Sequence, residues 1–124
     1  MDTTRIFRNA DNVVTYDAGH VIFRERDPGD LMYAVMEGEV EILVGDKPVE
    51  TIGVGGIFGE MALIDDGPRS ATARTKTACK LVPVTPKRFM FLVEQTPFFA
   101  IHVMKLMSER MRRMNRTLVA SANE

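Results

Sequence analysis

The most informative stretch of this chain runs from Phe58 to Thr72 and reads FGEMALIDDGPRSAT. Gly59 permits close backbone approach to a ligand, and the five residues after it, 60–64, can form one short helical turn. The first N–H groups of such a turn have no intrahelical partner and suit an anion. Residues 65–68 then reverse the chain and bring back Arg69, a forked cation, to the same place. The spacing therefore predicts a phosphate site.

Glu60 narrows the kind of phosphate that would fit this site. A carboxylate beside a bare phosphate is repulsive, but it can accept a hydrogen bond from a hydroxyl group such as a ribose 2′-OH. One arginine with backbone amides suits a singly charged phosphodiester, and Ser70 can add its hydroxyl and its own N–H. No lysine follows Gly59 as it would in a Walker-type loop. In the plainer alternative, Glu60 only favours a helix start and Arg69 pairs with it across the turn.

Glycine is confined to one part of the chain, and this predicts where the strands lie. All nine glycines fall between Gly19 and Gly67, where turn signals alternate with short apolar runs. The expected strands span residues 21–24, 31–36, 39–42, 49–52, 71–78 and 79–84, with a hairpin closed by Gly45 and Asp46. Short strands at this spacing predict a mostly β fold, an antiparallel β jelly roll (double-stranded β-helix), with its barrel over about 13–84.

Two C-terminal helices are expected after the barrel, over about 85–118. Thr85-Pro86 and Thr96-Pro97 each place a capping threonine before a proline at the first helical position. The first helix should run to about Glu94, and the second from Pro97 to about Leu118. Along the second, apolar residues recur at alternating spacings of three and four, namely Met104, Met107, Met111, Met114 and Leu118. This seam predicts packing either on the chain's own barrel or on a second copy.

The composition indicates one globular domain. The chain has 124 residues, of which 45% are hydrophobic, and its formal net charge of −1 argues against a strongly basic nucleic-acid binder. The single cysteine, Cys79, excludes an internal disulfide framework and is too few for a zinc or iron–sulfur site. No apolar run approaches a membrane span, and the N-terminus lacks a signal-peptide stretch, so we expect a cytoplasmic protein.

Several motifs resemble those of cyclic nucleotide-binding domains. Residues 58–72 resemble the phosphate-binding cassette of that family, with Phe-Gly-Glu, an apolar run and then Pro-Arg-Ser-Ala-Thr. Residues 19–23 and 27–33 resemble its early barrel strands, and residues 74–79 resemble its bacterial catabolite-activator branch. The similarity covers roughly residues 16–115. One departure is Arg26, where the family often has glycine; we expect it to affect only a surface turn.

The resemblance implies a role for each residue of the candidate site. Glu60 would accept the ribose 2′-OH, and Arg69 would pair with the exocyclic oxygens of the cyclic phosphate. The phosphate pocket would be lined by the backbone of Gly59, Met61, Ala62, Ser70 and Ala71. From the barrel, the base would be contacted by Ile42 and Ile52. From the last helix, it would be contacted by Arg110, Arg113 and Met114, which share one helix face.

The expected function is that of a sensor: one domain over residues 1–124 that binds a 3′,5′-cyclic nucleotide and is not an enzyme. The expected ligand is cAMP, although cGMP stays open because the Ser70 hydroxyl could reach a guanine amino group. The last helix would close over the base and change the surface offered to an effector protein. The activator branch pairs its long helices as a parallel dimer, which implies a possible homodimer here. We expect no metal, no cofactor, no direct DNA binding and no membrane partner.

Other classes of protein fit these residues less well. A cupin-type metal enzyme needs several histidines, and the chain has only His20 and His102. A nucleophilic hydrolase needs a base beside its nucleophile, and Cys79 has no histidine near it in sequence. A DNA-binding regulator needs a helix-turn-helix after the long helix, and we expect none here. The remaining alternative is a degenerate domain of the same fold that binds protein or dimerises without nucleotide.

Overall fold

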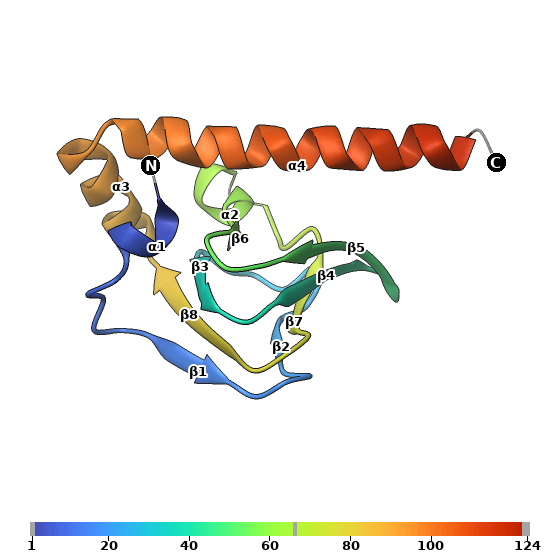
Figure 1. Cartoon of the computed structure of the whole chain (residues 1–124), viewed down its shortest axis with the longest axis horizontal. Helices are drawn as coiled ribbons and strands as arrows, with labels where there is room; N and C mark the ends of the chain where they lie inside the picture. Colours follow the sequence, from blue (N-terminus) through green and yellow to red (C-terminus); the bar gives the residue numbers. More distant parts are fainter. Residues whose placement is uncertain (1, 66, 123–124) are drawn as a thin grey trace.

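The computed structural model describes residues 2–65 and 67–122, and within them lie eight strands and four helices (Figure 1). The strands are β1 (Val14–Tyr16), β2 (Val21–Phe23), β3 (Met32–Glu37), β4 (Val40–Val44), β5 (Lys47–Ile52), β6 (Ile57–Phe58), β7 (Thr72–Thr75) and β8 (Cys79–Val84). The helices are α1 (Thr3–Ile6), α2 (Met61–Ile64), α3 (Pro86–Gln95) and α4 (Phe98–Ala122). Short strands followed by two longer helices confirm the predicted fold class.

The strands of the described residues form two four-stranded sheets, in the orders β1-β8-β3-β6 and β2-β7-β4-β5. Every pairing is antiparallel within these sheets. Strands β4 and β5 form the predicted hairpin, in which Val44 pairs with Lys47 around the turn at Gly45 and Asp46. The antiparallel architecture expected from the spacing of the turns is therefore confirmed.

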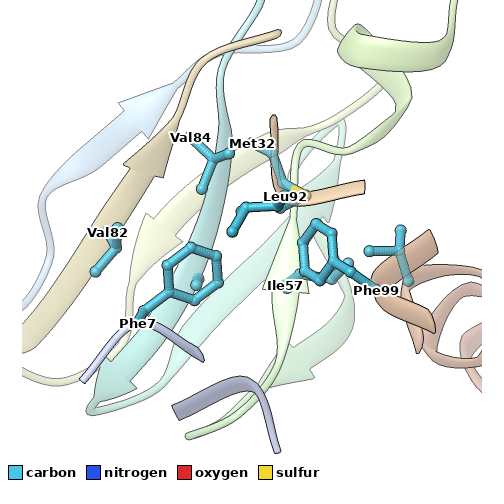
Figure 2. Packing of buried hydrophobic residues seen from close by; sticks show 9 residues of the cluster. Phe7, Met32, Ile57, Val82, Val84, Leu92 and Phe99 are labelled. Carbon is cyan, nitrogen blue, oxygen red and sulfur yellow. The ribbon is translucent and has the colours of Figure 1, made fainter. Parts of the chain in front are cut away.

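Strand β3 is apolar on both of its faces because both faces are covered. Met32 and Ala34 point into one core cluster, and Tyr33 and Val35 point into another, as alternation along a strand requires. The first cluster lies between a sheet and the helices (Figure 2) and contains Phe7, Met32, Ala34, Ile57, Val82, Val84, Leu92, Phe99 and Val103. The second lies between the sheets and contains Tyr33, Val35, Val40, Ile52, Phe58, Ala73, Cys79 and Leu81.

The two C-terminal helices begin close to where their capping signals predict. The Thr85 hydroxyl accepts a hydrogen bond from the Arg88 N–H at 3.1 Å, and Pro86 is the first residue of α3. Helix α4 begins at Phe98 and continues to Ala122, four residues past the expected end at Leu118. It crosses the barrel as one long rod whose C-terminal part extends beyond the sheets (Figure 1).

Three short elements, α1, β1 and β6, were not expected from the sequence, and the strand predicted over 71–78 is confined to β7. Elements of two to four residues leave too little periodicity to detect, and long-range contacts hold them in place. In α1, the buried Thr3 hydroxyl lies 2.6 Å from Nε2 of His102 on α4. His102 thus links α4 to α1.

Candidate functional site

Gly59 joins β6 to α2 in a conformation that favours glycine. Its φ is +78°, and a Cβ atom there would lie 2.9 Å from the Leu31 carbonyl oxygen and 3.0 Å from Nη1 of Arg69. The missing side chain therefore provides both the left-handed backbone and the space in which the Arg69 guanidinium lies. The close approach seen at this glycine is by groups of the protein itself, and the predicted approach of a ligand stays a prediction.

Arg69 is a buried cation whose side chain is held on several sides. The residue is 7% exposed. Its Nη1 donates to the Gly59 carbonyl at 3.2 Å, and its Nη2 donates to the Leu31 carbonyl at 2.8 Å. The guanidinium lies over the ring of Phe23, with Cζ 4.0 Å from the ring centroid. Gly29 also packs against it, since a Cβ atom at Gly29 would lie 2.7 Å from Nε.

The charge of Arg69 has no bonded counter-ion among the described residues. None of their carboxylates forms an ion pair with it, and its buried Nε has no hydrogen-bond partner among them. Burial lowers the pKa of Arg69, while Tyr33, Asp30 and Asp27 act in the opposite direction; arginine nevertheless stays protonated in proteins. A buried, uncompensated cation is costly, so Arg69 marks a place where an anion would bind favourably.

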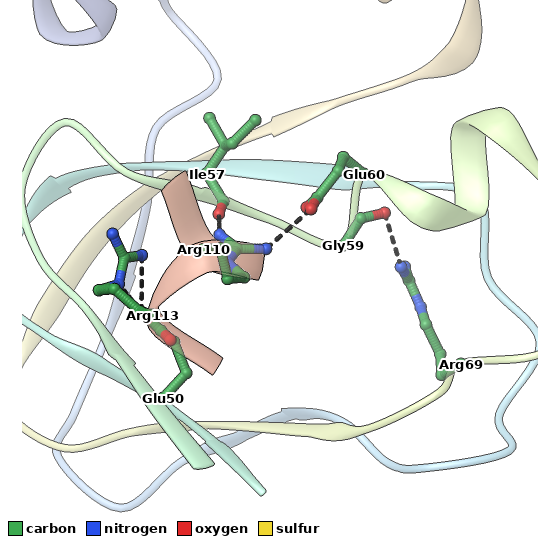
Figure 3. Close-up of polar contacts among 7 residues, drawn as sticks. All are labelled: Glu50, Ile57, Gly59, Glu60, Arg69, Arg110 and Arg113. Atoms are coloured by element: carbon green, nitrogen blue, oxygen red, sulfur yellow. Dashed lines mark hydrogen bonds and ion pairs between the residues drawn. The ribbon is translucent and has the colours of Figure 1, made fainter. Parts of the chain in front are cut away.

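Glu60 is buried beside this cation but pairs with a different arginine (Figure 3). The residue is 4% exposed, and its Oε1 accepts from Nη1 of Arg110 on α4 at 2.7 Å. Arg110 also donates through Nη2 to the Ile57 carbonyl. The other carboxylate oxygen, Oε2, is buried without a hydrogen-bond partner in the described part of the chain. The structure therefore lacks the Arg69–Glu60 pair of the plainer alternative and leaves one acceptor of Glu60 unused.

The turn that contains Arg26 supports the cassette directly. The Arg26 N–H donates to the Arg69 carbonyl at 2.7 Å, and the Arg69 N–H donates to the Asp27 carbonyl at 2.9 Å. Arg26 has a φ of +74°, in the left-handed region that glycine adopts most easily. Arg26 is exposed and lies in a turn, as expected, and the backbone of this turn also positions Arg69.

A cavity of about 520 Å³ connects these side chains and lies between the barrel and α4. Most of the predicted site residues line it, namely Ile42, Gly59, Glu60, Met61, Ala62, Arg69, Ser70, Ala71, Arg110 and Met114. Sequence reasoning missed further lining residues, among them Phe23, Val44, Val49, Glu50, Met107 and Met111. Met107 and Met111 could have been found from the methionine seam, whereas Glu50 carries no signal in its local sequence. The cavity has a size typical of small-molecule sites.

Two of the predicted site residues do not line the cavity. Ile52 pairs with Val40 and packs in the core cluster between the sheets, so other side chains cover it and it does not reach the cavity. Arg113 lies on α4 but its guanidinium reaches back to β5, where Nε and Nη2 donate to Oε1 of Glu50 at 3.2 and 2.9 Å. The structure thus brings ten of the predicted residues together and places these two elsewhere.

His20 and Cys79, which were considered for metal binding and nucleophilic catalysis, pack against other side chains. The ring of His20 packs on Tyr16, with centroids 4.8 Å apart. Cys79 is buried in the core, and burial raises the pKa of its thiol. Within residues 2–65 and 67–122, no group of three His, Cys, Asp or Glu residues could hold a metal ion. In the same part of the chain, none of the helices is long and apolar enough to cross a membrane.

The fold and the site together define a class of protein. A jelly-roll barrel holds a buried arginine and a buried glutamate at one cavity, and a long helix covers that cavity. The model of the family described as "Cyclic nucleotide-binding domain" matches residues 13–96, more than half of the chain, and the chain belongs to this family.

Relatives of this chain include membrane and transcription proteins. A cyclic nucleotide-gated potassium channel of Rhizobium etli is 41% identical over 93 residues, which are 75% of this chain and 26% of the channel. A CRP-like cAMP-activated global transcriptional regulator of Mycobacterium tuberculosis is 30% identical over 110 residues, 85% of this chain and 49% of the regulator. The crystal structure of the Thermus thermophilus catabolite activator protein superposes with a TM-score of 0.75 at 28% identity, covering 89% of this chain and 54% of that one. The chain thus spans between about a quarter and about half of these proteins.

Proposed function

We propose that this chain is a sensor domain that binds a 3′,5′-cyclic nucleotide, with cAMP as the ligand, and that it regulates a partner rather than catalysing a reaction. The observation that carries the proposal is the buried Arg69, which has no bonded carboxylate among the described residues. In the same cavity, Glu60 has a buried acceptor without a partner from the described chain. A cyclic nucleotide offers a singly charged phosphodiester and a neighbouring ribose hydroxyl, which match these two groups.

Each part of the ligand has a counterpart in the cavity wall. Arg69 would bind the exocyclic phosphate oxygens through its fork, with the Ser70 hydroxyl beside it. The backbone of the cassette would line the phosphate, at Gly59, Met61, Ala62, Ser70 and Ala71. Glu60 would accept the 2′-OH through Oε2 while Arg110 holds Oε1. The base would then lie against the apolar wall formed by Ile42, Val44, Val49, Met111 and Met114.

Helix α4 is the element through which binding would be transmitted. It contributes Met107, Arg110, Met111 and Met114 to the cavity, so a ligand there touches the helix directly. Arg110 links α4 to Glu60, a group that the ribose would also contact. A ligand changes the position of a helix only if it binds one position better than another. The Arg110–Glu60 contact would provide such a difference, because moving α4 away from the cavity would break it.

Isothermal titration with cAMP tests the proposed binding. A comparison with a ligand that lacks the ribose hydroxyl tests the role of Glu60. If Oε2 of Glu60 accepts a hydrogen bond from the ribose hydroxyl, the affinity for 2′-deoxy-cAMP should be lower than that for cAMP by roughly tenfold or more. The reason is that a hydrogen bond to a buried charge is lost. In Glu60→Ala this preference should shrink. Glu41→Ala is the matched control, since Glu41 also pairs with an arginine, Arg74, but does not line the cavity. An equal preference in wild type and Glu60→Ala would mean that Glu60 is structural.

We further propose that α4 pairs with a second copy of this chain. The expected seam divides in the structure: Met107 packs partly against the chain's own core, whereas Met104, Met111 and Leu118 are 53%, 64% and 68% exposed. These three residues are seven positions apart and so fall on one side of the helix. Ile101 and Val119 extend the exposed apolar surface. Such a stripe on a helix that projects past the barrel is suited to a parallel partner helix.

The dimer is tested by placing a charge on the exposed seam. Met104→Glu and Leu118→Glu should each convert a dimeric wild type to monomer in sedimentation experiments, because two like charges would be buried together. Neither residue lines the cavity, so cAMP affinity should change less than oligomeric state. Met107→Glu is a poorer test because Met107 lines the cavity. Arg116→Glu, on another face of α4, is the control. A monomeric wild type, or dimeric seam variants, would contradict the dimer.

A further inference from the structure

Glu50 is a carboxylate on the inner side of the barrel wall. It lies on β5 directly opposite Ile42 on β4, and both residues line the cavity. Its side chain is only 10% exposed. The register shifts beside it, because Ile42 pairs with Glu50 whereas Leu43 pairs with Pro48, so Val49 is an extra residue in β5. Such a bulge changes where neighbouring side chains point, and here Val49 and Glu50 both reach the cavity.

The hydrogen bonds of Glu50 leave one of its oxygens available. Nε and Nη2 of Arg113 both donate to Oε1, at 3.2 and 2.9 Å. Among the described residues, Arg113 donates to Oε1 alone, and none donates to Oε2. The arginine is about half exposed while the carboxylate is nearly buried. Arg113 therefore holds the carboxylate from its more exposed side, and the second oxygen of this cavity-lining residue keeps its capacity to accept a hydrogen bond.

The polar groups at the cavity and beside it lie in sequence across the view of Figure 3. In Figure 3, Arg69 lies at one side, the Glu60–Arg110 pair lies in the middle, and the Glu50–Arg113 pair lies at the other side. If the phosphate binds Arg69 and the ribose binds Glu60, as proposed above, the base extends toward Glu50. The rest of that end is apolar, with Val44, Val49 and Met114. Glu50 is then the acceptor closest to the outer edge of the base.

We propose that Glu50 is the residue that selects the base, by accepting a hydrogen bond from the 6-amino group of adenine through Oε2. Arg113 is a positioning residue that holds the carboxylate through Oε1. Guanine carries a carbonyl oxygen at the same ring position, which a carboxylate repels. The pair therefore favours adenine over guanine. This inference rests on the proposed function and goes beyond it, because it assigns the selectivity of the site to a residue of β5.

The experiment compares cAMP with purine riboside 3′,5′-cyclic monophosphate, which lacks only the 6-amino group. Wild type should bind cAMP roughly tenfold more tightly than the purine analogue, as expected for a hydrogen bond to a charged group. Glu50→Leu removes both carboxylate oxygens, so this ratio should fall toward one. Glu50→Gln keeps a neutral acceptor and should lower the ratio less. The preference for cAMP over cGMP should fall in Glu50→Gln, because a glutamine amide can turn to donate to the guanine oxygen. Arg113→Met, which keeps Glu50, should retain part of the preference for the amino group.

The outcomes separate this inference from the proposed function. Both ligands carry the same phosphate and ribose, so tight binding of both with no preference in wild type would overturn the role of Glu50 and leave the cyclic nucleotide site intact. A ratio unchanged in Glu50→Leu would overturn it too, even if both affinities fall, because that pattern indicates only a structural ion pair. Greater loss of cGMP than of cAMP in Glu50→Gln would mean that the carboxylate reads guanine instead. Failure of wild type to bind either ligand would refute the proposed function and the inference together.

Discussion

Replacing Arg69 by alanine is expected to weaken cAMP binding by roughly ten- to a hundredfold, since a charge-assisted hydrogen bond of about 1.5–3 kcal/mol is lost. The expectation rests on the position of the guanidinium, which lines the cavity, is buried, and pairs with no carboxylate of the described chain. Arg69→Lys should give a smaller loss, because lysine keeps the charge but lacks the planar fork that fits two phosphate oxygens. Isothermal titration with cAMP measures both effects.

The matched control is Arg74→Ala. Arg74 lies on β7, five residues farther along the chain, and it is a partly exposed arginine that pairs with Glu41 outside the cavity. Its loss should leave cAMP affinity nearly unchanged, because exposed ion pairs contribute little and this one does not touch the ligand. A folded Arg69→Ala protein with wild-type affinity would show that the anion binds elsewhere. Thermal unfolding without ligand establishes that each variant is folded.

Gly38→Ala is expected to destabilise the fold by about 2–5 kcal/mol, from backbone strain together with overpacking. Gly38 lies between β3 and β4 with a φ of +88°, a conformation that costs free energy for any residue with a Cβ atom. A Cβ atom there would lie 2.2 Å from the Ala78 carbonyl oxygen and 2.8 Å from Sγ of Cys79. The carbonyl belongs to the backbone and cannot rotate away, so the turn at Gly38 or the segment at Ala78 would have to shift.

Gly45→Ala separates the two causes. Gly45 also has a positive φ, +61°, but no atom lies within 4 Å of the position of its Cβ atom. Its replacement should therefore cost only the backbone strain, about 1–2 kcal/mol. Urea unfolding of the two variants measures the difference between them. Equal losses at both positions would show that the contact with Ala78 is relieved easily and that strain alone governs Gly38.

Much of this protein could be predicted from its sequence because the decisive signals are local. The cassette at 58–72 contains a glycine, a glutamate and an arginine within eleven residues, and all three line the cavity. The hairpin at Gly45 and Asp46 and the threonine cap of α3 are also local, since they depend on the conformations and hydrogen bonds of a few neighbouring residues. Such features form in the same way in many folds, and so residue types and their spacing are enough to recognise them.

Tertiary structure alone decided which side chains meet across the cavity. Glu60 pairs with Arg110, fifty residues away, and not with the nearby Arg69. Glu50 meets Arg113 at a separation of 63 residues. These contacts depend on strand register, on a bulge in β5 and on the rotation of α4 about its axis, none of which is encoded in local periodicity. For that reason the sequence by itself determined the fold and the Arg69 end of the cavity, whereas the contact between α4 and β5 determined the Glu50 end.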